Sequence, residues 1–228
     1  IIHVEIMATA TIPADLPPMM EFKAKADEII KNRYGKSVEH IHAPKTYEEY
    51  FYYVNRGKKS KNRGKIYGSP LQKGNWCNSR LKVDVLEKEQ RNAITYIGIA
   101  ADEKKRFGIL SEFKRSPLVE YGWTEEMCRN WCSANGLLSP IYKTSMRGGC
   151  WFCHNQGVEQ LRLLRKEYPE YWALLLRWDE DSPATFKGNG HTVRDFERRF
   201  ALEETGAIPK DKPFRWKMIN QSRNDEDE

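Results

Sequence analysis

Hydrophobic and polar residues alternate in two short segments near the start of the chain, and a segment with helical spacing lies between them. Residues 1–13 begin with the apolar pattern of a strand, and residues 37–43 alternate in the same way. Residues 21–35 have helical spacing and end at Gly35, as helices commonly do. This order of strand, helix and strand is typical of a parallel sheet with crossover helices, so the pattern predicts an α/β fold.

Further along, the chain has mostly helical patterns. Thr124 is placed to cap a helix that ends at the glycine turn of residues 135–136, and Pro169 should break or kink the long helix in which it lies. The other elements expected after residue 45 are helices over residues 46–57, 75–92, 158–181 and 191–206 and a β-rich run over residues 93–103.

The composition of the chain bears on its location and on the kind of partner that it binds. No segment approaches the ~18 uninterrupted apolar residues of a membrane span, and no secretory leader is recognisable, so we expect a cytoplasmic protein without a membrane partner. The formal net charge of +6 favours a polyanionic partner, a nucleotide or a nucleic acid, although a solvated basic surface has the same composition. Because Ile1 already lies in the opening strand pattern, we expect a segment upstream of it.

Five cysteines are an odd number for a disulfide framework and favour metal binding or thiol chemistry instead. Cys150 and Cys153 form a CxxC pair after Gly148 and Gly149, which allow the backbone to bend around a metal ion. The same pair is also compatible with a redox dithiol or with two buried thiols. Candidates for the remaining ligands are Cys77, Cys128, Cys132 and His154.

Three of these candidates have neighbours that bear on their chemistry. Cys128 and Cys132 are four residues apart on an expected helix, so they share one face. Cys77 is followed by Arg80 and Lys82, two cations that are able to bind phosphate and to lower the pKa of a nearby thiol. Basic residues on a helix are, however, most often simply solvated.

Taken together, several segments resemble the phosphoadenosine phosphosulfate (PAPS) reductase-like family of the adenine nucleotide α-hydrolase, or PP-loop ATP pyrophosphatase, superfamily. The resemblance covers residues 5–205 and rests on the following segments: IGIAADE, KKRF, PLVEYGWTEEMC, CWFC and EQLRLLRKEYPEYW. It implies a Rossmann-like, doubly wound, mostly parallel sheet with a C-terminal helical, cysteine-rich part. The implied organisation is a nucleotide-binding domain over residues 1–120, a helical metal- or cluster-binding part over residues 121–215 and an acidic, disordered tail over residues 216–228.

The resemblance also implies a cofactor and its ligands. The family's first cysteine, followed three residues later by an arginine, falls on Cys77 and Arg80, and its CxxC pair falls on Cys150 and Cys153. The remaining ligand falls on Cys132, with Cys128 as the substitute. Four cysteines suit a [4Fe–4S] cluster, and zinc is the alternative for the same ligands.

The chain also departs from the family pattern. It has no SGGxDS phosphate loop, which follows the first strand in the family, so this loop and the N-terminal strand are expected upstream. TIPADLP stands where the family has a DTGxExP-like segment, with Thr11 replacing the acid. The paired CC and the C-terminal ECG motif of sulfonucleotide reductases are absent, so thioredoxin-linked PAPS reduction is not the favoured activity.

Three functional hypotheses follow. The first is a nucleotide-dependent sulfur-handling enzyme of the sulfurtransferase or reductase type, which uses ATP or an adenylyl sulfate-type nucleotide and a sulfur donor protein. In it, Arg80 and Lys82 bind phosphate, and Glu103 and Arg106 face the nucleotide. The second is a nucleic-acid-associated sulfur-modification module in which the loop GKKSKNRGK, residues 57–65, follows a phosphate backbone. The third is a catalytically silent fragment with a structural zinc ion.

Overall fold

The computed structural model describes residues 1–58, 60, 62–73, 75–89, 93–143, 149–210 and 214–221. The chain folds into two compact units, and each unit is built from two separate stretches of sequence. The first unit comprises Ile1–Thr46 and Asn78–Gly148, and the second comprises Tyr47–Cys77 and Gly149–Glu228. Each unit therefore contains residues from both the expected nucleotide-binding part and the expected helical part.

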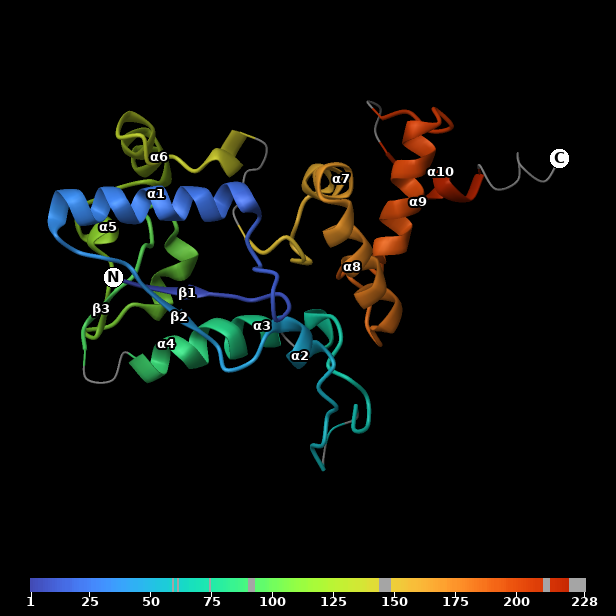
Figure 1. Cartoon of the computed structure of the whole chain (residues 1–228), viewed down its shortest axis with the longest axis horizontal. Helices are drawn as coiled ribbons and strands as arrows, with labels where there is room; N and C mark the ends of the chain where they lie inside the picture. Colours follow the sequence, from blue (N-terminus) through green and yellow to red (C-terminus); the bar gives the residue numbers. More distant parts are fainter. Residues whose placement is uncertain are drawn as a thin grey trace. The chain divides into compact units, whose positions relative to one another are not determined.

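The first unit begins with a strand, a helix and a parallel strand. β1 (Ile2–Glu5) pairs in parallel with β2 (Glu39–His42), and α1 (Pro17–Tyr34) connects the two strands (Figure 1). α1 ends at Gly35, which has a φ of +62° and donates its N–H to the carbonyl of Lys31 over 2.9 Å. The strand, helix and strand predicted for this part of the chain are confirmed.

A second pair of strands lies in the same unit. β3 (Thr95–Tyr96) pairs in parallel with β4 (Lys114–Arg115), so only two residues of the expected β-rich run over residues 93–103 are in a strand. The run ends early because the N–H of Ile99 bonds to the carbonyl of Ile97 over 3.0 Å, which takes the backbone out of the extended conformation. The predicted α/β class is confirmed, and the strands of the described residues form two separate two-stranded parallel sheets.

The helices of the first unit follow their sequence signals. α6 (Glu125–Ala134) begins at Thr124, whose hydroxyl oxygen accepts the N–H of Met127 over 3.2 Å, and it ends at a turn in which Gly136 has a φ of +67°. Its cap and its end are both as predicted. The other helices of this unit are α4 (Asp84–Glu89), α5 (Pro117–Glu120) and the 3₁₀ segments Lys104–Ile109 and Pro140–Lys143.

Helical backbone runs without a break from Trp76 to Glu89, within the helix predicted for residues 75–92, of which residues 90–92 lie outside the described residues. It consists of α3 (Trp76–Asn78), a π-helical segment (Ser79–Val83) and α4. A π-helical turn inside a helix is rare and is often found at functional sites. The segment with this geometry begins two residues after Cys77, in the region to which the sequence assigned phosphate binding.

The second unit is mainly helical. Its helices are α2 (Tyr47–Phe51), α7 (Val158–Glu167), α8 (Pro169–Asp181), α9 (Val193–Glu204), α10 (Lys217–Gln221) and a 3₁₀ segment (Pro70–Lys73). The expected break at Pro169 separates α7 from α8, which confirms that prediction. α10 lies where the acidic tail was expected to begin, and residues 222–228 of that tail are outside the described residues. Within the described part of the chain, no helix is long and apolar enough to span a membrane.

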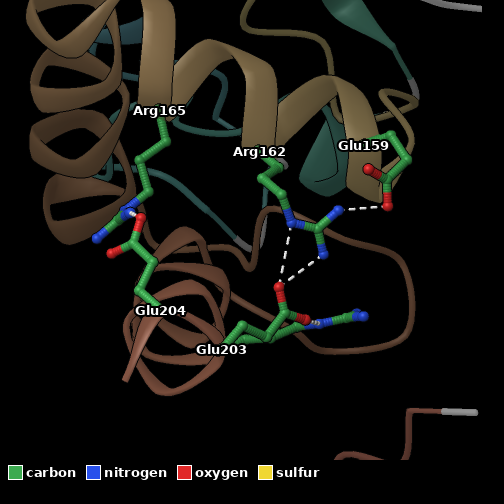
Figure 2. Close-up of polar contacts among 6 residues, drawn as sticks. Glu159, Arg162, Arg165, Glu203 and Glu204 are labelled. Carbon is green, nitrogen blue, oxygen red and sulfur yellow. Dashed lines mark hydrogen bonds and ion pairs between the residues drawn. The ribbon is translucent and has the colours of Figure 1, made fainter. Parts of the chain in front are cut away.

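Ion pairs join α7 to α9 in the second unit. Arg162 of α7 donates from Nη2 to Glu203 of α9 over 2.7 Å, and Arg199 donates from Nε to the same carboxylate over 2.8 Å (Figure 2). Only 4% of the Glu203 side chain is exposed, so both contacts lie largely away from water. Arg165 pairs in addition with Glu197 and Glu204. These contacts fix the register between the two helices.

Candidate metal centre

Tyr47 lies at the centre of the aromatic core of the second unit. Its ring centroid is 5.1 Å from that of Trp76, 4.0 Å from that of Phe152 and 5.0 Å from that of Trp178. Trp76 directly precedes Cys77, and Phe152 directly precedes Cys153. Packing on one tyrosine therefore brings two distant segments that carry cysteines into the same part of the unit.

The electrostatics of Tyr47 indicate where the sulfur atoms lie. Only 3% of this residue is exposed, and burial raises the pKa of its phenol well above the ordinary value. Negative charge on Cys77, Cys150 and Cys153 raises this pKa further. Because charges act on a titrating group only within about a Debye length, this influence is consistent with the three cysteines lying in the neighbourhood of the Tyr47 hydroxyl.

The CxxC pair forms a tight turn that is anchored in the core. The N–H of Cys153 donates to the carbonyl of Cys150 over 3.0 Å, and the side-chain amide of Gln156 donates to the same carbonyl over 2.9 Å. Trp151 and Phe152, between the two cysteines, are buried, whereas both cysteines are partly exposed. The turn therefore holds two accessible thiols on a rigid support. Gly149 precedes it with a φ of +153°, and Gly148 is outside the described residues.

Lys187 holds the segment that follows the CxxC turn. Its ammonium group donates to the carbonyl oxygen of His154 over 2.6 Å and also to that of Gln156. Burial, and secondarily the charge of Lys187, lowers the pKa of His154, so the neutral imidazole is favoured. The Nδ1 atom of His154 is buried and has no hydrogen-bond partner among the described residues. The sequence placed His154 behind the cysteines as a candidate ligand, and the structure places it beside the CxxC turn.

The donor chemistry of this site fits a soft metal or an iron–sulfur cluster. Three thiols lie in one unit, and thiolates are the preferred ligands of zinc and of iron–sulfur clusters. Among the described residues, however, no three cysteine, histidine, aspartate or glutamate side chains are positioned to hold one ion together. A bound metal would therefore have to draw these sulfur atoms closer. Cys132, expected as the fourth ligand, belongs to the first unit, and the other three belong to the second.

Cys132 and its substitute Cys128 line an apolar pocket in the first unit. The pocket has a volume of about 540 Å³, and its other lining residues are Pro117, Leu118, Tyr121, Trp123 and Trp131. Burial raises the pKa of Cys128, and the charge of Cys132 raises it further. The two thiols share a face of α6, as their spacing predicts, and the apolar setting favours the neutral form of Cys128.

The four residues expected to bind the nucleotide lie in two separate segments of the first unit. Arg80 lies in the π-helical segment and donates to Asp84 over 3.0 Å, while Lys82 is exposed. Glu103 accepts the N–H of Ala100 and pairs with Arg106 over 2.7 Å, and this pair lowers the pKa of Glu103. No hydrogen bond or ion pair among the described residues joins one group to the other. Their assignment to the nucleotide stays a prediction.

The structure adds two residues to the candidate site, Tyr47 and Lys187, which the sequence did not indicate. Tyr47 was part of an aromatic-rich helical pattern with other tyrosines beside it, and nothing in that pattern shows which ring is buried. Lys187 lies in the polar segment TFKGNGH, where a lysine is ordinarily solvated. Both depend on contacts between segments far apart in the chain.

Replacement of Tyr47 by Phe should make the stability of the protein less sensitive to alkaline pH. In the unfolded chain this phenol ionises near pH 10, whereas its raised pKa keeps it neutral in the folded protein. Its contribution to stability is therefore complete below about pH 10 and is lost as the pH rises, by about 1 kcal/mol at pH 11. Denaturant unfolding at pH 8 and pH 11 measures this loss. Equal losses in the unmodified protein and in Tyr47→Phe would contradict it.

Comparison with known proteins gives no relative. No protein-family model matches the chain, and neither a curated protein nor a solved structure matches it.

Proposed function

We propose that the protein is a PAPS reductase-like, nucleotide-dependent sulfur-handling enzyme of the PP-loop superfamily. Its metal centre would be held by Cys77, Cys150 and Cys153, with Cys132 as the fourth ligand. The observation that carries this proposal is the packing of Trp76 and Phe152, which directly precede Cys77 and Cys153, on the ring of Tyr47. An iron–sulfur cluster bound there would supply a centre for carrying electrons or sulfur.

Two features of the first unit support the nucleotide-binding part of the proposal. β1, α1 and β2 form a strand–helix–parallel strand unit, with Ile2 opposite Glu39. Such units build the Rossmann-like, doubly wound sheets that bind nucleotides at the carboxyl ends of their strands. Arg80 and Lys82 lie in the π-helical segment, and their cationic groups are suited to the phosphates of ATP or an adenylyl sulfate-type nucleotide.

Single cysteine substitutions test which thiols hold the metal. In protein purified without oxygen, Cys77→Ser, Cys150→Ser and Cys153→Ser should each lose most of the bound iron and acid-labile sulfide, because a serine hydroxyl is a poor ligand for a soft metal. Circular dichroism would verify that each variant is folded. Full iron and sulfide in both Cys150→Ser and Cys153→Ser would contradict the proposed site.

The two cysteines of α6 provide a matched pair for the fourth position. They lie one helical turn apart and line the same pocket. If Cys132 is the ligand, Cys132→Ser should lose iron while Cys128→Ser retains it, and the reverse result would assign the position to Cys128. Iron retained in both variants would place the fourth ligand outside α6.

A further inference from the structure

An ordered antiparallel ribbon follows α2 in the second unit. Val54 and Ile66 form an antiparallel bridge, and the N–H of Tyr67 donates to the carbonyl of Tyr53 over 3.0 Å. The N–H of Asn55 similarly donates to the carbonyl of Lys65 over 2.9 Å. We call residues 53–58, 60 and 62–67 the basic ribbon; Lys59 and Lys61 are outside the described residues. Figure 1 shows it as a loop that extends from the end of α2.

A buried asparagine at the base of the basic ribbon fixes the conformation of its tip. Asn55 is 8% exposed; its side-chain oxygen accepts the N–H of Gly57 over 3.0 Å, and its amide donates to the hydroxyl of Ser60. That hydroxyl also accepts the N–H of Asn62 over 3.2 Å. A tip that is held in this way loses less conformational entropy when it binds a partner than a mobile loop does.

The basic ribbon lies in a part of the chain that has no acidic residue. Residues 50–83 contain nine lysines and arginines and neither aspartate nor glutamate. Within the basic ribbon, four cations are described and exposed: Arg56 and Lys58 on the outgoing arm, and Arg63 and Lys65 on the returning arm. Within the described residues, none of these four forms an ion pair with a carboxylate. Their charges are therefore available to a polyanion.

Aromatic rings lie at the base of the same ribbon. Tyr53 is 39% exposed, and its ring centroid is 5.2 Å from that of Tyr67 in an edge-to-face arrangement. Exposed rings beside a row of cations are typical of surfaces that bind single-stranded nucleic acid, because unpaired bases stack on the rings while the cations contact phosphates. A duplex would offer the phosphates but not the free faces of its bases.

We propose that the basic ribbon binds single-stranded nucleic acid, with Arg56, Lys58, Arg63 and Lys65 on the phosphates and Tyr53 stacked on a base. Cations on both arms suit a repeating anion better than a single phosphate group, which is bound by donors converging on one point. This interaction is independent of the metal centre, so failure of one proposal leaves the other standing.

Fluorescence anisotropy with a labelled 20-nucleotide oligothymidylate tests the proposal on the full chain. Simultaneous replacement of Arg56, Lys58, Arg63 and Lys65 by Gln should weaken binding at least tenfold and should reduce the slope of log K against log salt by about 3, since each contact with a single strand contributes about 0.7. Tyr53→Leu should weaken binding several-fold without changing this slope, because it removes stacking and no charge.

The control removes the same charge from another surface. Lys36, Lys88, Lys104 and Lys105 are exposed in the first unit, and their joint replacement by Gln should leave binding within about twofold of the unmodified protein. Equal weakening by the two quadruple variants would show that only net charge matters and would overturn the proposal. Equal or tighter binding of a duplex of the same length, or equal competition by polyglutamate, would also overturn it.

Discussion

Glu203→Gln should destabilise the protein by about 3 kcal/mol, because removing the acidic partner of a buried ion pair leaves a buried cation uncompensated. The Glu203 carboxylate is the common acceptor for Arg162 and Arg199, whose side chains are only 16% and 10% exposed. Glutamine retains the shape of the side chain but carries no charge. Arg162 would keep Glu159 as a second partner, whereas the largely buried guanidinium group of Arg199 would lie beside a neutral amide (Figure 2).

The adjacent Glu204 provides the matched control. It pairs with Arg165 from the same helix, but its side chain is 64% exposed, and Arg165 retains Glu197 as a second partner. Glu204→Gln should therefore cost less than about 1 kcal/mol, as is usual for exposed ion pairs. Thermal unfolding of the two variants measures the difference. Similar unfolding temperatures for both would contradict the buried role of Glu203.

Gly68→Ala should have a comparably large effect, about 3 kcal/mol, from a left-handed backbone combined with a steric overlap. Gly68 has a φ of +61°, and a Cβ atom there would lie 2.4 Å from Cδ of Pro183 and 2.8 Å from the hydroxyl of Ser182. The proline ring is tied to the backbone and has little freedom to move. The carbonyl of Gly68 also accepts the indole N–H of Trp76 over 3.2 Å, so a shift would reach the aromatic core.

Replacement of Gly64 by Ala separates the cost of the left-handed backbone from the cost of the steric overlap. Gly64 has a φ of +82°, but among the described residues no atom other than those of its chain neighbours lies within 4 Å of the position that a Cβ would occupy. Gly64→Ala should therefore show only the backbone cost, about 1 kcal/mol. Chemical denaturation of both variants gives the comparison, and a cost for Gly68→Ala no larger than that for Gly64→Ala would contradict the packing at Pro183.

Local elements were predictable wherever the sequence contains a start or stop signal. Gly35 ends α1, Thr124 begins α6 and Pro169 separates α7 from α8, each through chemistry that involves only neighbouring residues. The strands were less predictable. The run after residue 93 is rich in β-forming residues, yet strand pairing depends on a partner elsewhere in the chain, and a tight turn at Ile97–Ile99 ends the strand.

The candidate site likewise combines residues that the sequence identified with residues that depend on contacts between distant segments. Spacing selected the CxxC pair, the family resemblance selected Cys77, and the structure places all three in the second unit. The aromatic segment that was expected to be a helix over residues 46–57 is helical only to Phe51, because the chain then enters the basic ribbon. Tyr47 and Lys187 act through contacts with segments about a hundred and about thirty residues away, and no local pattern encodes such contacts.

The central claim is that the second unit contributes cysteines to a metal centre, and its most direct test is metal and acid-labile sulfide analysis of the full chain purified without oxygen, together with an absorption spectrum. The account predicts about four iron and about four sulfide per chain and a charge-transfer band in the visible region. About one zinc per chain without sulfide would instead indicate a structural site and contradict the sulfur-handling role. The absence of both iron and zinc would contradict the metal centre itself.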